Sequence, residues 1–211
     1  MDNYRNYGTF AVMTTTERRI QTLLRRAGTA RSRELVGAGT TRSQLSRMAA
    51  KGQVVRVARG LYALPDYKSG EHGALVTVAK RAPGVLFCLL TALRIHDLTT
   101  QAPFEVWIAI GNKEHPPRLD YPPLRTVRFS TAALAVGVET RQVDGAKVRV
   151  TNVAKTVADC FKFRNKIGLD VALEALREAR RTQMASADAL WRYAKINRVT
   201  NVMRPYLEAV A

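Results

Sequence analysis

The chain of 211 residues is 46% apolar and 24% charged, a balance that suits one large or two small globular domains and excludes a disordered chain. It holds 34 Lys and Arg against 17 Asp and Glu, and the formal net charge of +17 makes nucleic acid the expected partner. No apolar run reaches the roughly 18 residues of a membrane span, and no segment has the features of a signal peptide or of a basic membrane-binding helix, so we expect a cytoplasmic protein.

The basic charge is densest in the first third of the chain. Residues 1–65 hold 12 Lys and Arg against 3 Asp and Glu, whereas residues 66–211 hold 22 against 14. Pro65 and the polar run DYKSGEHG after it are typical of a domain boundary. We therefore expect an α+β protein in three parts, namely a flexible extension over residues 1–13, a basic domain over 14–66 and a larger α/β domain over 70–211.

Three short helices are predicted in the basic domain. The first has one apolar face, has Thr16 as its candidate N-cap and ends at Gly28. The second, TARSRELV, begins with Thr29 as its N-cap and stops at a glycine-rich turn. The third has Thr40 as its N-cap and runs through TRSQLSRMAAK to Gly52. This order of helices is typical of a helix-turn-helix.

A hairpin is predicted directly after the third helix. The sequence QVVRVARGLYALP contains two short β-branched and aromatic runs around Arg59 and Gly60, and glycine permits the backbone angles of a tight turn. A hairpin in this position is the wing of a winged helix-turn-helix.

The outer surface of the third helix has the composition of a DNA-recognition helix. Opposite Leu45 on a helical wheel lie small, polar and basic side chains, which allow a helix to enter the major groove. Arg47 is the first choice for base readout, because Arg can bind both O6 and N7 of guanine. The full set of expected DNA contacts, which includes the second helix and the wing, is Arg31, Arg33, Thr40, Thr41, Arg42, Ser43, Gln44, Ser46, Arg47, Lys51, Arg56 and Arg59.

The second domain alternates between helical and strand patterns. A helix is predicted over residues 74–81, VLFCLLTALRI is an apolar strand or helix, and FEVWIAIG is a buried strand. LRTVRFS, VETRQV and AKVRV are further strands of a mixed or antiparallel sheet, the last two joined through Asp144 and Gly145. Everything beyond Thr151 has a helical pattern, and the last segment is interrupted by Pro205.

Catalytic and cofactor motifs have little support in the sequence. The three histidines are too dispersed for a local metal motif, and GAGTTRS lacks the GK[ST] ending of a phosphate loop. Cys88 and Cys160 lie in apolar runs without a CxxC spacing, so we expect them to be buried and reduced. We therefore expect no metal and no cofactor. A metal-dependent nuclease that uses Asp66, Glu105 and Asp159 remains an alternative, although no Asp/Glu-x-Lys triplet accompanies them.

Three stretches carry a family likeness, namely the winged helix that ends in GQVVRVARGLYALP, FCLLTALRIHDLT with FEVWIAI, and VTNVAKTVADCFKFRNKIGLDVALEAL. Together they extend from about Thr16 to Ala179, and they resemble the AbiEi family, the antitoxins of bacterial type IV toxin-antitoxin systems. The resemblance implies an N-terminal domain that binds inverted repeats in its own promoter and represses the operon. It also implies a C-terminal domain that counters a nucleotidyltransferase-like toxin without forming a stable complex with it. The positions that it assigns to DNA are Thr41, Arg42, Ser43, Gln44 and Arg47 on the recognition helix and Arg56 and Arg59 on the wing.

The resemblance does not indicate which residues carry antitoxicity. Lys155, Thr156 and Asp159 are candidates, because polar groups on an otherwise apolar helix need partners. Lys155 and Asp159 are also spaced for an i,i+4 ion pair, and we place a structural role first. A winged-helix regulator with a ligand-sensing C-terminal domain is the alternative from a different class.

Overall fold

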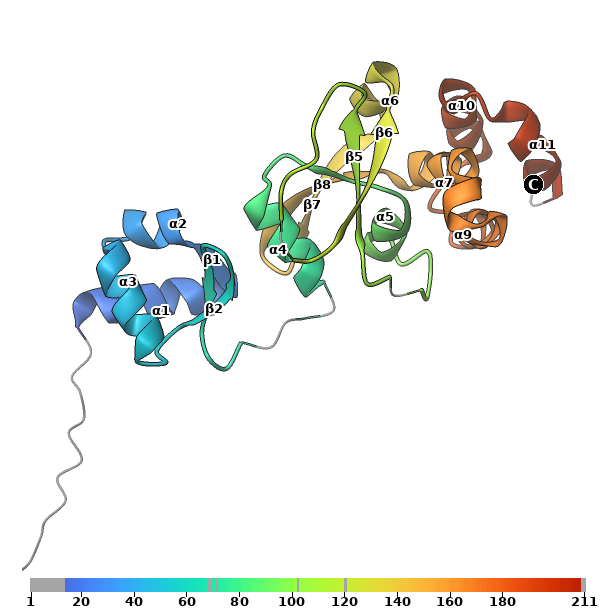
Figure 1. Cartoon of the computed structure of the whole chain (residues 1–211). Helices are drawn as coiled ribbons and strands as arrows, with labels where there is room; N and C mark the ends of the chain where they lie inside the picture. Colours follow the sequence, from blue (N-terminus) through green and yellow to red (C-terminus); the bar gives the residue numbers. More distant parts are fainter. Residues whose placement is uncertain (1–13, 68–69, 71, 102, 120, 210–211) are drawn as a thin grey trace, which may run out of the picture. The chain divides into compact units, whose positions relative to one another are not determined.

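The computed structural model describes residues 14–67, 70, 72–101, 103–119 and 121–209. The chain divides into two compact units, Met1–Tyr67 and Lys68–Ala211, each with its own hydrophobic core (Figure 1). The predicted α+β class is confirmed, with a helical segment at the C-terminal end. The extension expected over residues 1–13 lies outside the described residues.

Unit 1 packs three helices against a small antiparallel sheet. Its strands have the order β1-β3-β2, so β3 is central. The buried core is formed mainly by Ile20, Leu24, Leu35, Leu45 and Met48, which come from all three helices. The elements in chain order are α1 (Thr15–Ala27), β1 (Thr29–Arg31), α2 (Ser32–Gly37), α3 (Arg42–Ala50), β2 (Val55–Ala58) and β3 (Leu61–Ala63).

Helix α1 begins earlier than the sequence suggests. The Thr14 side chain accepts a hydrogen bond from the backbone N–H of Glu17, and the Glu17 carboxylate accepts one from the backbone N–H of Thr14. This reciprocal capping box satisfies two of the N–H groups that a helix start leaves without partners. The prediction of Thr16 as N-cap is therefore wrong by two residues, and Thr16 lies inside the first turn.

The second helix is shorter than predicted, because its expected beginning forms a strand. Thr29 pairs with Ala63 and Arg31 pairs with Leu61 in the antiparallel ladder of β1 and β3. Thr29 is therefore not an N-cap, and α2 begins only at Ser32. The correction has a physical cause: β3 offers backbone partners to residues 29–31, and no local pattern in the sequence reveals that partner strand.

Unit 2 contains a mixed five-stranded sheet with the strand order β6-β5-β4-β8-β7. The pairs β5·β6 and β4·β8 are parallel, whereas β4·β5 and β7·β8 are antiparallel. The elements are α4 (Gly73–Arg81), β4 (Leu86–Phe87), α5 (Leu89–Ile95), β5 (Val106–Gly111), β6 (Leu124–Phe129), α6 (Thr131–Ala135), β7 (Val138–Val143), β8 (Ala146–Thr151), α7 (Val153–Lys162), α8 (Arg164–Ile167), α9 (Leu169–Arg181), α10 (Ala187–Asn197) and α11 (Thr200–Ala209).

Alternate strand residues divide the core of unit 2 into two clusters. On β5, Trp107 and Ala109 belong to the cluster that contains α7, α9, α10 and α11, whereas Ile108 and Ile110 belong to the cluster that contains α4. Successive side chains of a strand point to opposite faces, so the sheet is covered on both sides. Figure 1 shows the C-terminal helices gathered as one layer beside the sheet.

Three details of unit 2 differ from the simplest interpretation of its sequence. The apolar run VLFCLLTALRI is both strand and helix, since β4 ends at Phe87 and α5 begins at Leu89. Helix α6 has no counterpart among the predicted elements. Helix α11 continues through Pro205 instead of ending there. The hairpin of β7 and β8 is as predicted, and its two turn residues, Asp144 and Gly145, both have positive φ angles.

None of the helices in the described ranges is both long and apolar enough to cross a membrane.

Candidate nucleic-acid interface

Helix α3 is held in place by one buried face, and its opposite face is free for contact. Leu45 and Met48 are buried in the core of unit 1. The exposed face carries Arg42, Ser43, Ser46, Arg47 and Ala50, all open to solvent. The predicted surface is thus presented outward, with two guanidinium groups one turn or more apart and only small side chains between them.

The start of α3 differs from the prediction in its N-cap. Thr41, and not Thr40, is the N-cap: its hydroxyl accepts from the backbone N–H of Gln44 at 3.1 Å. The Gln44 amide oxygen in turn accepts from the backbone N–H of Thr41 at 2.8 Å, so this group is used within the capping box. Thr40 is buried. The hydroxyls of Thr41 and Ser43, which are both exposed, lie 3.0 Å apart at the helix start.

Arg47 and Lys51 border a hollow between α3 and the start of α1. The hollow has a volume of about 240 Å³ and is also lined by Glu17. The hydrogen bond from the Thr14 backbone lowers the pKa of the Glu17 carboxyl, and the Lys51 ammonium lowers it further. Lys51 and this carboxylate therefore lie close enough to interact electrostatically.

The wing has the predicted turn and places two arginines on its surface. Strands β2 and β3 pair antiparallel, and an irregularity between Arg56 and Ala58 bends β2 at that point. Gly60 has a φ of 71°, a left-handed angle that favours glycine. Its carbonyl accepts a hydrogen bond from the backbone N–H of Ser32, which fixes the turn against the start of α2. Arg56 and Arg59 are both exposed.

The two arginines assigned to the second helix have different environments. Arg33 is exposed on the first turn of α2. Arg31 is half-buried in strand β1 and not on the helix, and its backbone N–H donates to the Glu34 carboxylate at 2.8 Å. Arg33 therefore has the freer position for a phosphate contact.

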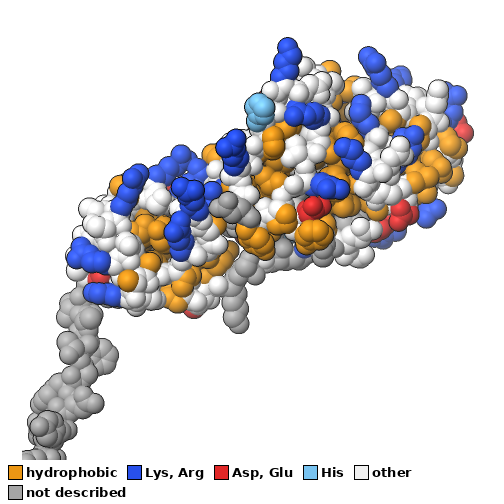
Figure 2. Space-filling view, viewed as in Figure 1, with side chains coloured by type: hydrophobic (Ala, Val, Ile, Leu, Met, Phe, Trp, Pro, Cys, Tyr) orange, Lys and Arg blue, Asp and Glu red, His pale blue; other side chains and the backbone are white. Residues whose placement is uncertain are grey.

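The exposed cations of unit 1 are available to a polyanion. Among the described residues, no salt bridge involves any of the six exposed candidates, which are Arg33, Arg42, Arg47, Lys51, Arg56 and Arg59. On the face shown in Figure 2, Lys and Arg side chains are spread over both units, whereas Asp and Glu are visible in only a few places. Cations without salt bridges on an exposed helix and hairpin are what phosphate binding requires.

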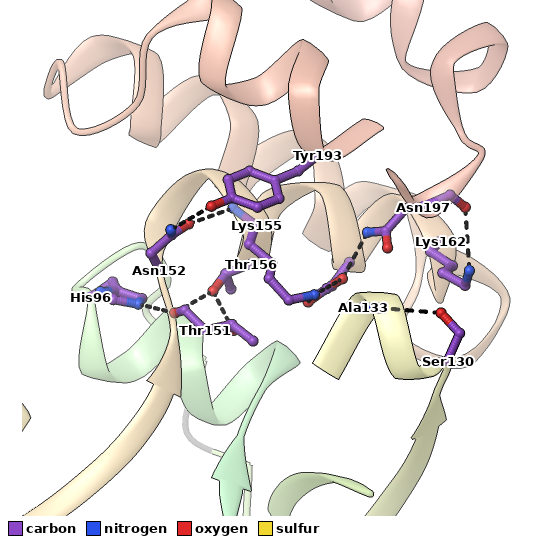
Figure 3. Close-up of polar contacts among 11 residues, drawn as sticks. His96, Ser130, Ala133, Thr151, Asn152, Lys155, Thr156, Lys162, Tyr193 and Asn197 are labelled. Atoms are coloured by element: carbon purple, nitrogen blue, oxygen red, sulfur yellow. Dashed lines mark hydrogen bonds and ion pairs between the residues drawn. The ribbon is translucent and has the colours of Figure 1, made fainter. Parts of the chain in front are cut away.

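A separate cluster of polar groups lies inside unit 2, where β8 joins α7 (Figure 3). The Thr151 carbonyl accepts from the Thr156 hydroxyl at 2.9 Å and lies 2.6 Å from Nε2 of His96, which donates to it. Asn152 caps α7 by accepting from the backbone N–H of Lys155, and it donates its side-chain N–H to the Tyr193 hydroxyl at 2.9 Å. These bonds fasten α7 to β8 and α10, and they fasten the end of α5 to β8.

The Lys155–Asp159 ion pair is present and completely buried. The Lys155 ammonium donates to both carboxylate oxygens of Asp159 at 3.0 Å, and the side chain of Asn197 donates to one of them at 2.7 Å. The ammonium also lies 4.5 Å from the centre of the Phe129 ring. Burial raises the pKa of Asp159, although Lys155 and Asn197 oppose that rise. Because Lys155, Thr156 and Asp159 are each 0% exposed, none of them can touch a partner without a rearrangement of α7.

The remaining candidate groups are dispersed. The described residues contain no group of three or more His, Cys, Asp or Glu arranged to hold a metal ion. Glu105 lies 3.8 Å from Arg125, whereas Asp159 is buried beside Lys155, so these two carboxylates of the nuclease alternative are not brought together. Cys88 and Cys160 are free and buried as predicted, and burial raises the pKa of both thiols.

Most of unit 1 matches a known protein family. Residues 18–65 match the family model described as "Transcriptional regulator, AbiEi antitoxin". The chain is also similar to the crystal structure of the Rv2827c protein from Mycobacterium tuberculosis, with a TM-score of 0.57 and 14% sequence identity, over 94% of this chain and 81% of that one. At this identity the likeness concerns the fold alone. No curated protein matches the chain.

Proposed function

We propose that the protein is a DNA-binding repressor of its own operon, since residues 18–65 match the AbiEi family of transcriptional regulators and antitoxins. The observation that carries this proposal is the exposed face of α3, where Arg42 and Arg47 flank small polar side chains and form no salt bridge among the described residues. A helix of this kind enters the major groove with its N-terminal residues at the base edges. Arg56 and Arg59 of the wing and Arg33 of α2 then contact phosphates on the flanks.

Fluorescence anisotropy with the DNA upstream of the gene tests the repressor function. Binding to that duplex should exceed binding to a scrambled duplex by roughly 10³-fold at physiological salt, and both affinities should fall as salt rises. A variant with Arg42→Ala and Arg47→Ala should lose the difference between the two duplexes. A matched control, Arg177→Ala with Arg181→Ala, removes the same charge from unit 2 and should retain it. Equal, purely salt-dependent binding of the wild type to both duplexes would contradict sequence-specific repression.

We further propose that unit 2 provides the antitoxin function and counters a nucleotidyltransferase-like toxin encoded in the same operon. The match of unit 1 to an antitoxin family supports this role. Co-expression with the toxin gene measures rescue of growth. Rescue by the Arg42→Ala, Arg47→Ala variant would mean that antitoxicity is independent of operator binding, and failure of the wild type to rescue would contradict the antitoxin function.

A ligand-sensing role for unit 2 has one observation in its favour. A hollow of about 440 Å³ has apolar walls that include Leu86, Ile110 and Leu134, and it is also lined by Glu114, His115 and Arg149. A small organic ligand with both apolar and polar groups would suit it. If this alternative holds, a ligand that protects unit 2 against thermal unfolding will also shift the affinity for the upstream DNA.

A further inference from the structure

The five-stranded sheet of unit 2 has an open edge at β7. This strand pairs with β8 along one side, and among the described residues no strand lies along its other side. None of its six residues is buried, and Thr140 and Gln142 are exposed. The outward N–H and C=O groups of an edge strand are hydrogen-bonding positions that a further strand can fill. The order of the side chains on β7 then determines which strand fits there.

Two opposite charges lie on one face of β7. Glu139 and Arg141 are two residues apart, so their side chains lie on the same side of the sheet, where they form an ion pair. The two side chains are 34% and 41% exposed, so both can also be reached from the edge. On the other side of the sheet, Val138, Thr140 and Gln142 carry no charge. The edge therefore presents one negative and one positive side chain among uncharged neighbours.

A second copy of β7 fits this edge in one antiparallel register. Two identical strands that pair about a two-fold axis are centred on one residue, because opposed residues of an antiparallel ladder must point the same way. Centred on Glu139 or on Arg141, the pairing would set two like charges directly opposite each other, which is destabilising. Centred on Thr140, it sets Glu139 of each copy opposite Arg141 of the other. The four charges then alternate in sign, and the two Thr140 side chains form a favourable cross-strand pair.

The opposite edge of the sheet, β6, lacks this self-complementarity. Its charged residues are Arg125 and Arg128, so two copies of β6 would bring only positive charges together. The Arg128 side chain also donates to the backbone carbonyls of Gly111, Asn112 and Glu114, which holds it within its own sheet. Charged side chains on an edge strand oppose its pairing with other strands. Of the two edge strands in the described residues, β7 is thus the one that suits its own copy.

We propose that β7 is a homodimer interface, through which two copies of the chain join their sheets edge to edge about a two-fold axis at Thr140. The contact consists of backbone hydrogen bonds between the two strands and the alternating charges of Glu139 and Arg141. A strand of six residues buries less surface than a standard interface, so the dimer is weak and forms at high protein concentration. The interface involves unit 2 alone and does not use the DNA contacts proposed for unit 1.

Sedimentation equilibrium of the full chain, from about 10 μM to about 1 mM, measures the association of two copies. Each copy carries a formal charge of +17, so the measurement is made at physiological salt, where a Debye length of about 8 Å screens the overall repulsion. The mass of the wild type should rise from that of a monomer to that of a dimer. A monomer at every concentration would overturn the proposal. Masses that grow beyond the dimer, as a head-to-tail contact of β7 with β6 would produce, would also overturn it.

Charge reversal tests the register. Glu139→Arg and Arg141→Glu each set like charges opposite one another in the register centred on Thr140, although they change the net charge in opposite directions. Each should weaken dimerisation about tenfold, since a substitution acts twice in a symmetric dimer. The double variant, Glu139→Arg with Arg141→Glu, restores the alternating charges at the wild-type net charge and should recover the dimer. Unchanged dimerisation of the single variants, or a double variant that stays monomeric, would contradict this interface.

A second pair of variants leaves the ion pair of β7 intact. Thr140→Lys sets two ammonium groups face to face at the two-fold axis and should weaken dimerisation about tenfold. Gln142→Lys is the matched control, because it adds the same charge at another exposed position of the strand but faces the uncharged Val138. Equal effects of the two lysines would indicate general repulsion and would overturn the proposal. Thermal melting checks that all variants fold, and since no DNA is present, the result does not depend on operator recognition by unit 1.

Discussion

The positions of Arg47 and Lys51, one turn apart at the end of α3, lead to different expectations for the two side chains. Arg47 lies on the exposed face that enters the groove, whereas Lys51 follows the last residue of the helix and lies near Glu17. Arg47→Ala should cost roughly 1–3 kcal/mol of operator affinity and relax specificity at one base pair. Lys51→Ala should weaken binding to all sequences about equally. Titration of both variants against operator and scrambled DNA checks this, and equal effects on the two duplexes for Arg47→Ala would remove it as a base-reading residue.

At Gly137 the neighbouring side chains leave no space for a Cβ atom. Its φ is 63°, and an added Cβ would lie 2.7 Å from the Lys155 stem and 2.8 Å from the Tyr193 ring. Gly137→Ala should therefore destabilise unit 2 by about 2–4 kcal/mol, from overpacking together with the left-handed backbone angle. Gly84→Ala is the control, because its φ is 90° and nothing lies within 4 Å of the added Cβ. Denaturant unfolding should show a much smaller decrease in stability for Gly84→Ala, and equal decreases would contradict the packing argument.

Titration of His96 makes the free energy of unfolding depend on pH. Burial lowers its pKa from the ordinary value of 6.5, although the hydrogen bond to Thr151 and the nearby Glu139 carboxylate oppose that fall. A His pKa that is lower in the folded state contributes stability that is complete above pH 6.5 and is lost as the pH falls toward the folded value. His96→Gln keeps a donor for Thr151 and removes the titration. Unfolding free energies measured from about pH 7.5 down to about pH 5 should fall more steeply for the wild type than for His96→Gln.

At the scale of elements, α7 carries charged groups within a stretch, Val153–Phe161, that is buried throughout. Asp159→Asn would leave the Lys155 ammonium buried without a counter-charge, at a cost of about 3–5 kcal/mol. The double variant Lys155→Met, Asp159→Leu removes both charges and should be much closer to the wild type. Melting temperatures of the single and double variants test this order of stability. Rescue of growth in cells that express the toxin measures the contribution of the ion pair to antitoxin activity. Loss of rescue in the double variant with an unchanged melting temperature would assign the pair a direct role.

Elements whose boundaries depend on local signals are predictable from the sequence, whereas those that depend on distant partners are not. The exposed and buried faces of α3 follow from the positions of Leu45 and Met48, and the β7–β8 hairpin follows from Asp144 and Gly145. Strand β1 could not be predicted from the local sequence, because residues 29–31 form a strand only where β3 lies beside them. The N-caps of α1 and α3 are displaced from the predicted threonines because neighbouring threonines have the same capping chemistry.

At the scale of the whole molecule, the parallel pairs of strands could not be predicted from the sequence. Val106 pairs with Leu124 and Leu86 pairs with Arg149, and neither register has a turn that could specify it. The same holds for the polar groups of unit 2. The Lys155–Asp159 pair follows from its i,i+4 spacing, but Asn197, which donates to Asp159, lies on α10 and 38 residues away. The excess of positive charge is visible in the composition, whereas the position of a strand at the edge of the sheet requires the fold.

The two buried cysteines can report the opening of unit 2 through their reaction with a thiol reagent. Cys88 and Cys160 both belong to unit 2, and the sequence has no other cysteine. With burial raising the pKa of both thiols, a thiol reagent can modify them only when unit 2 opens. The rate of labelling in native buffer therefore reports the opening of unit 2 alone, and it does so without an engineered dye. Adding operator DNA, RNA or toxin to the labelling reaction would show which of these partners restrains that unit.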